Sequence, residues 1–97
     1  MNESILSVKS YEFALRIIKL YRFMVDEHHE YVLSKQILRS GTSLGANIEE
    51  SVHAQSKTDF IHKLSIAQKE ANETNYWLRL IKDNGYFRRE ACRIINW

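Results

Sequence analysis

The sequence predicts an all-α fold, an antiparallel up-down four-helix bundle whose fourth helix is short. The chain has no proline and 3 glycines in 97 residues, which favours long helices over turn-rich β architecture. Apolar residues recur at steps of three and four along most of the chain, the spacing of one helical face. This length allows a single domain, residues 1–97, whose modest core would gain from oligomerisation.

Composition excludes several classes of protein. Cys92 is the one cysteine, so an internal disulfide scaffold is excluded. The N-terminus lacks the apolar run of a signal peptide, and no stretch reaches the roughly 18 apolar residues of a membrane span. The net charge is +2, mildly basic. We therefore expect a cytoplasmic protein that has no membrane contact.

The first predicted helix runs from about Ser7 or Lys9 to Asp26, with Ser7 or Ser10 as its N-cap. The following residues, 27–30, contain no apolar side chain and predict a connection. The apolar positions of the helix share one face and are expected to be buried: Phe13, Ala14, Ile17, Ile18, Tyr21, Met24 and Val25.

The second predicted helix runs from about Tyr31 to Ala54 and has an unusual middle. Residues 40–47 are mostly very small and include two glycines, each of which costs a helix about 1 kcal/mol relative to alanine. A neighbouring backbone at close approach would offset that cost, as would a large aromatic side chain opposite, for which Trp77, Tyr21 and Phe13 are candidates. The predicted buried stripe is Leu33, Ile37, Leu44, Ile48 and Val52.

The third predicted helix is capped by Ser56 or Thr58 and ends at Asn84, where Gly85 supplies a left-handed residue. The fourth runs from Phe87 to Trp97 and is much shorter, which predicts an open groove along the bundle. Ala91, Ile94 and Ile95 lie on one side of the fourth helix, and the buried seam predicted for the third is Phe60, Leu64, Ala67, Ala71, Thr74, Leu78 and Ile81.

Residues 39–50 and 56–67 resemble the signature of the four-helix bundle proteins encoded in intervening sequences of bacterial 23S rRNA genes, also labelled S23 ribosomal proteins. The family pattern is R-S-x-x-S-I-x-x-N-I-x-E-G followed by S-x-x-[DE]-F, and Asn84-Gly85-Tyr86 resembles the family's break before the last helix. Ser51 departs from the pattern, which usually has glycine there. The matching positions are Arg39, Ser40, Ser43, Leu44, Asn47, Ile48, Glu50, Ser56, Asp59 and Phe60.

The resemblance implies an antiparallel four-helix bundle that assembles into a ring-like homopentamer. The family includes the accessory proteins of diversity-generating retroelements, in which a basic ring engages the reverse transcriptase and RNA. Members usually continue into a long fourth helix, whereas this chain ends at Trp97. Either the chain is a shortened version or another subunit supplies the missing packing. For most members the family name implies a fold and no activity.

A string of polar residues on the second predicted helix forms the first candidate site. Arg39, Ser43, Asn47 and Glu50 follow one another at spacings of four, four and three, so they share one face. Glu70 and Glu73 of the third helix could approach them. A polar layer of this kind fixes the register of two helices, since buried polar groups need partners. The alternative is a pocket around Arg39 for a ligand or an RNA phosphate.

Two basic clusters form the second candidate, a surface for RNA or DNA. Phosphate contacts dominate the affinity of such surfaces, and a ring of subunits would multiply the few contacts of one copy. The alternative is an ordinary solvated helix face. The clusters comprise Lys9, Arg16, Lys19 and Arg22 near the N-terminus, and Arg88, Arg89 and Arg93 near the C-terminus.

Catalytic and metal-binding patterns are weak. Glu50-x-x-His53 and Asp59-x-x-His62 have the spacing of di-iron ligands, but a site needs two further glutamates from other helices. We therefore predict no metal, no cofactor, no small-molecule substrate and no enzymatic activity. The leading hypothesis is a non-catalytic homo-oligomeric scaffold or adaptor that contacts RNA, DNA or a nucleic-acid enzyme. The alternative is a structural or protein-binding module whose open groove receives a partner helix.

Overall fold

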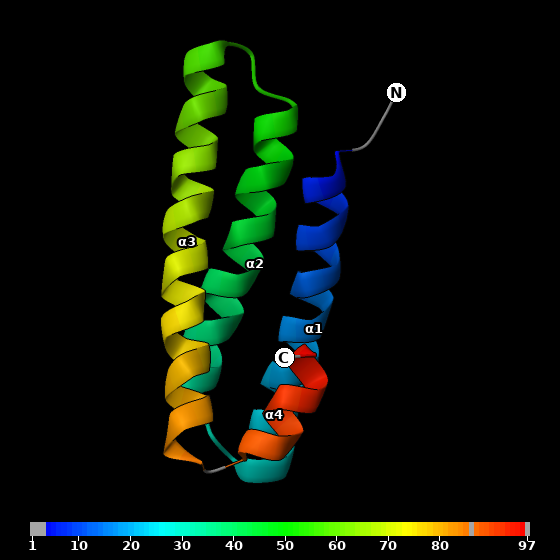
Figure 1. Cartoon of the computed structure of the whole chain (residues 1–97), viewed down its shortest axis with the longest axis vertical. Helices are drawn as coiled ribbons and strands as arrows, with labels where there is room; N and C mark the ends of the chain where they lie inside the picture. Colours follow the sequence, from blue (N-terminus) through cyan, green and yellow to red (C-terminus); the bar gives the residue numbers. More distant parts are fainter. Residues whose placement is uncertain (1–3, 86, 97) are drawn as a thin grey trace.

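The computed structural model describes residues 4–85 and 87–96, and it confirms the all-α bundle with a short fourth helix. Successive helices run in opposite directions (Figure 1). The second helix packs against the first and the third, and the fourth packs against the lower half of the first and against the third. The four helices are α1 (Ile5–His28), α2 (Leu33–Val52), α3 (Lys57–Asn84) and α4 (Arg88–Ile95).

Helix α1 begins earlier than predicted, because the capping serine is Ser4. Its hydroxyl oxygen accepts a hydrogen bond from the backbone N–H of Ser7 at 2.9 Å. The prediction of Ser7 or Ser10 as N-cap is therefore wrong, and Ser10 instead donates to the carbonyl of Ser7. The helix ends at His28, two residues beyond the predicted end, and the left-handed backbone of His29 (φ 53°) then turns the chain towards α2.

Helix α2 is two residues shorter at each end than predicted, and a glutamate caps it. The Glu30 carboxylate accepts hydrogen bonds from the backbone N–H groups of Val32, Leu33 and Ser34 at 3.2, 2.9 and 2.8 Å. A carboxylate at this position satisfies the free donors of the first turn and suits the positive end of the helix dipole. Glu30 thus fixes where α2 starts, a role that the sequence pattern had not suggested.

Helix α3 has the predicted ends, whereas α4 is shorter than predicted. Ser56 accepts from the backbone N–H of Asp59 at 3.1 Å, and Gly85 is left-handed at φ 77°. Helix α4 begins after the buried residue Phe87 and ends at Ile95, and the next residue, Asn96, has a left-handed backbone. The predicted final residue of this helix, Trp97, lies outside the described residues.

The core forms where α4 covers the groove between α1 and α3. Ile18, Val52 and Phe60, which were predicted to be buried, are exposed. Leu20 was missed, because α4 covers the side of α1 that carries it and leaves the side of Ile18 open. The main buried cluster is Ile17, Leu20, Met24, Ile37, Leu78, Ile81, Phe87, Ala91 and Ile95.

Both helical glycines of α2 face α1 closely. A Cβ added to Gly45 would lie 3.4 Å from the carbonyl oxygen of Ser10, so the expected close approach of a backbone is present. At Gly41 an added Cβ would lie 2.8 Å from Cγ1 of Ile17. The residue opposite Gly41 is therefore this isoleucine, and the proposed aromatic partners are wrong.

Candidate nucleic-acid interface

Helix α4 is anchored against the C-terminal half of α1. The ring of Phe87, just before α4, lies 5.8 Å from that of Phe23 and 4.8 Å from that of His28, both on α1. Helix α4, which carries three of the arginines, runs antiparallel to α1 and lies along its lower half (Figure 1). We call the seven exposed basic residues the basic surface: Lys9, Arg16, Lys19, Arg22, Arg88, Arg89 and Arg93.

On α1, the basic residues extend from the edge that α4 covers. Arg16 and Lys19 lie seven and four residues before Phe23, so they are on the α4 side of the helix. Lys9 lies a further seven residues before Arg16 and continues this row upward. Arg22 directly precedes Phe23 and lies about 100° from it around the helix, outside this row and on the face of Leu15 and Ile18.

On α4, the buried positions leave the opposite side to arginines. Ala91 and Ile95 are buried against the core, whereas Arg88, Arg89 and Arg93 are exposed. Gly85, Arg88, Arg89 and Cys92 line a shallow depression of about 520 Å³. Guanidinium groups are well suited to bidentate contacts with phosphate oxygens. Several carboxylates lie close in sequence to the basic surface and would oppose an anion: Glu90 on α4, Asp83 at the end of α3, and Glu12, Asp26 and Glu27 on α1.

The polar string of α2 joins that helix to α3. The Arg39 guanidinium contacts the carboxylates of Glu70, at 3.3 Å, and of Glu73. The Ser43 hydroxyl donates to Glu70 at 3.3 Å, and the Asn47 amide donates to the carbonyl of Ser43 at 2.9 Å. Arg39 therefore already has two anionic partners, which favours a role in helix register over a phosphate pocket.

This network shifts the pKa of its charged members. Its hydrogen bond with Glu73 raises the pKa of Arg39 above the ordinary value. The same bond, and a second one donated by Trp77 Nε1 at 3.2 Å, lower the pKa of Glu73. Glu50 stands apart from this network: it pairs with Lys63 at 2.7 Å and raises the pKa of that lysine. The four-residue string of α2 thus divides between two separate contacts with α3.

A buried hydroxyl pair that the sequence pattern had not indicated also links α2 to α3. The hydroxyl oxygens of Ser40 and Thr74 lie 2.8 Å apart, and both side chains are buried. Ser40 donates in turn to the carbonyl of Gln36 at 3.0 Å. The available signal was Thr74 itself, a hydroxyl within an otherwise apolar seam, which needs a partner when buried.

The histidine and carboxylate motifs are used locally. His53 lies 3.3 Å from Glu49, and Glu50 is engaged by Lys63. Within residues 4–85 and 87–96, no three side chains of His, Cys, Asp or Glu are grouped so that they could hold a metal ion. Cys92 is a half-buried free thiol. None of the described helices has an apolar stretch long enough to cross a membrane.

A second apolar row, on the outside of α1, was also missed. We call it the α1 stripe: Val8, Tyr11, Leu15 and Ile18, all exposed and spaced by three, four and three residues. Part of the stripe lines a shallow depression of about 500 Å³ that Glu49 of α2 borders. Contiguous exposed apolar rows of this kind mark interaction surfaces. The signal for it was the spacing, hidden in the sequence by the stronger core pattern beside it.

Comparison with known proteins gives the chain a family context. The profile of the family described as 23S rRNA-intervening sequence protein matches residues 2–96. A crystal structure of a protein with unknown function, from the S23 ribosomal protein family of Bacteroides thetaiotaomicron VPI-5482, is 59% identical with a TM-score of 0.87. The alignment covers 95% of this chain and 85% of that one. No curated protein matches the sequence.

Proposed function

The chain belongs to the family of 23S rRNA-intervening sequence proteins, and from this premise we propose that it is a non-catalytic homo-oligomeric scaffold that binds RNA or DNA through its basic surface. A nucleic-acid enzyme bound to the same RNA would be held beside it. The observation that supports this proposal most is the docking of α4 on α1, which places the helix that carries the second basic cluster beside the helix that carries the first.

Assembly is needed to make the basic surface effective. One copy offers seven basic side chains, partly opposed by nearby carboxylates, and so few phosphate contacts give weak binding at physiological salt. A closed ring would repeat the surface around one axis and turn weak contacts into avid binding. Five copies, the number implied by the family resemblance, are our working assembly.

The α1 stripe is the surface through which we propose that copies associate. Its four apolar side chains are exposed in the single chain, and burial of such area drives association. The stripe lies beside Lys9 and Arg16, because Leu15 and Arg16 are about 100° apart around the helix, whereas Lys19 and Arg22 follow Leu15 by four and seven residues and share its face. A neighbouring copy on the stripe would therefore leave Lys9, Arg16 and the arginines of α4 accessible.

The test of nucleic-acid binding is a charge reversal with a matched control. We expect replacement of Arg16, Lys19, Arg88 and Arg89 by glutamate to abolish binding of a labelled single-stranded RNA and of a DNA duplex. In wild-type protein the logarithm of affinity should fall steeply with the logarithm of salt concentration. The readout is fluorescence anisotropy over a salt series.

The control reverses four exposed charges elsewhere: Lys35, Lys57, Lys69 and Arg79. This control changes the net charge by the same amount as the first variant. An equal loss of RNA and DNA binding in both variants would therefore mean that binding depends on the net charge of the protein and not on the basic surface. Unchanged binding in the first variant would remove the nucleic-acid half of the proposal. Circular dichroism on all three proteins confirms that each remains helical.

A purely structural or protein-binding module is the second candidate function. The cavity of about 390 Å³ beside α4 favours it, because this cavity is largely apolar. Such a module would bind its partner with little dependence on salt and would show no affinity for RNA.

A further inference from the structure

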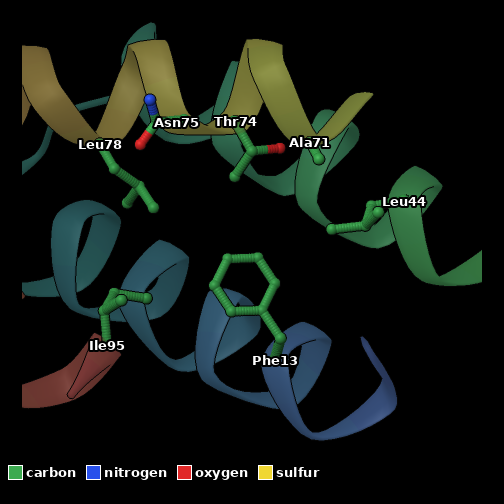
Figure 2. A pocket seen from close by; sticks show the side chains of 7 residues that line it. All are labelled: Phe13, Leu44, Ala71, Thr74, Asn75, Leu78 and Ile95. Atoms are coloured by element: carbon green, nitrogen blue, oxygen red, sulfur yellow. The ribbon is translucent and has the colours of Figure 1, made fainter. Parts of the chain in front are cut away.

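Two exposed aromatic side chains, His29 and Tyr31, lie on the turn between α1 and α2. Tyr31 is 52% exposed, and its hydroxyl oxygen lies 3.2 Å from Nδ1 of His29. The ring of Phe13, by contrast, points from α1 towards α3 (Figure 2) and packs against the core. The rings of His29 and Tyr31 are not among the side chains that form the main buried cluster or pack against it. Packing of the bundle therefore does not account for a tyrosine at this position.

The turn that carries Tyr31 is held in place by hydrogen bonds on both of its sides. The backbone N–H groups of His29 and Glu30 donate to carbonyls of the last turn of α1 at 3.1 and 2.9 Å. The Glu30 carboxylate caps α2, and the Ser34 hydroxyl donates to the carbonyl of Glu30 at 2.7 Å. A ring on such a fixed turn loses little conformational freedom when a flat ligand stacks on it.

This turn begins beside the start of α4. The ring of His28 lies 4.8 Å from that of Phe87, at the lower end of the bundle (Figure 1). Tyr31 is three residues beyond His28, and Arg88 directly follows Phe87. Because three residues span at most about 10 Å, Tyr31 and the first arginines of α4 are within reach of one short oligonucleotide.

The charges at this end of the bundle favour a base, rather than a phosphate, at Tyr31. Arg88 and Arg89 line the depression of about 520 Å³ at the start of α4, and their guanidinium groups suit phosphate oxygens. Carboxylates surround the turn and flank these arginines, and they would repel a phosphate from Tyr31. They are Asp26, Glu27 and Glu30 near the turn, and Asp83 and Glu90 near the arginines.

An uncharged base can still stack on the tyrosine ring. Stacking of this kind needs a base that is unpaired and turned out of its own strand, which a perfect duplex does not offer. The arrangement of one exposed ring beside two arginines therefore suits a single strand, with its phosphates on the arginines and a base on the ring.

We propose that this end of the bundle binds single-stranded nucleic acid, with an unpaired base stacked on Tyr31 and the neighbouring phosphates on Arg88 and Arg89. This narrows the ligand of the proposed function, on which it rests, from nucleic acid in general to strands with unpaired bases. Stacking tolerates all four bases, so we expect little preference for sequence.

The test compares three labelled ligands by fluorescence anisotropy with the full chain: a uridine oligonucleotide of about 12 nucleotides, a strand of equal length without bases, and the oligonucleotide paired with its complement. Tyr31→Ala should weaken the uridine oligonucleotide by about fivefold or more and leave the other two ligands unchanged, because only the first offers unpaired bases. Tyr31→Trp keeps an aromatic ring and should retain binding. Tyr76→Ala removes a tyrosine of α3 that is 51% exposed and, as the matched control, should leave all three affinities unchanged.

Unchanged binding of the uridine oligonucleotide by Tyr31→Ala would overturn the inference. An equal loss with all three ligands would also overturn it, because Tyr31 would then act through the fold or the phosphates and not through a base. In either case the proposed function stands if reversal of Arg16, Lys19, Arg88 and Arg89 still abolishes binding. Wild-type protein that binds none of the three ligands would overturn both.

Discussion

Gly41 and Gly45 both face α1, but they leave different amounts of room. We expect Gly41→Ala to destabilise the protein by about 1–3 kcal/mol, because the new methyl would overlap the fully buried Ile17. Gly45→Ala, the matched control, meets Ser10 at an ordinary contact distance of 3.4 Å and gains up to about 1 kcal/mol of helix propensity. Urea unfolding of both variants measures the difference. Equal stability of the two would contradict the contact with Ile17.

A larger side chain at Gly45 should be tolerated less well. Gly45→Leu places a branched side chain against the backbone of Ser10, which cannot move aside as a side chain can. We expect a loss of about 1–3 kcal/mol and a weaker assembly. A melting temperature and a solution mass equal to those of wild type would show that α1 and α2 do not need this close approach.

Glu73 should make stability sensitive to acid. Its pKa is lower in the folded chain than its ordinary value of 4.5, first because of the hydrogen bond with Arg39 and then because of that with Trp77. The stabilising contribution is therefore complete above that ordinary value and is lost as the pH falls through the lowered folded pKa. We expect Glu73→Gln to flatten the decline of unfolding free energy below pH 4.5. Glu27→Gln, outside this network, should retain the full decline.

At the scale of elements, α4 depends on one anchor. Phe87 is buried against Phe23 and His28, and α4 itself spans only 8 residues. We expect Phe87→Ala to cost about 3–5 kcal/mol, since it leaves a large cavity at the point where α4 joins the bundle. Hydrogen exchange should show lost protection in α4 first, with α2 and α3 less affected. Uniform loss across all four helices would mean that α4 is not a separable unit.

The helix ends that the sequence predicts correctly are those set by contacts between residues that are neighbours in the chain. Helix α3 has its predicted ends because Ser56 and Gly85 act on their immediate neighbours. The length of α4 and the exposure of Ile18 and Phe60 depend on where α4 docks, which a helical period cannot show. Glu30 was missed for a related reason, since its carboxylate reaches forward to donors that only the finished turn brings near.

The candidate site was predictable in composition and not in arrangement. The sequence singled out the basic residues of both clusters, and their roles in binding remain predictions. That α1 and α4, which carry the two clusters, lie side by side depends on contacts such as that between Phe23 and Phe87, residues far apart in the chain. The α1 stripe was not predicted, because the apolar residues of the first helix were assigned to a single buried face and a second apolar row beside that face was not considered.

At the scale of the whole molecule, the expected self-association can be tested directly by the mass of the protein in solution. Light scattering on a sizing column should give a mass near five subunits for wild type, and Leu15→Glu should shift it towards the single-chain mass of 11.5 kDa. A charge in the centre of the α1 stripe would have to lose its hydration when the stripe is buried in the assembly. Leu80→Glu, exposed on α3, is the control and should not change the mass. Wild type at 11.5 kDa would contradict the proposed self-association.

The contact between α4 and α1 also has a consequence for the order of folding. Helices α1 and α2, and then α2 and α3, are neighbours along the chain, so their pairing closes only short loops and should be fast. Phe23 and Phe87 are separated by more than sixty residues, and their meeting requires a much larger loss of chain entropy. We therefore expect α4 to dock last, onto a preformed three-helix platform, and the arginines it carries to join the basic residues of α1 only in that final step.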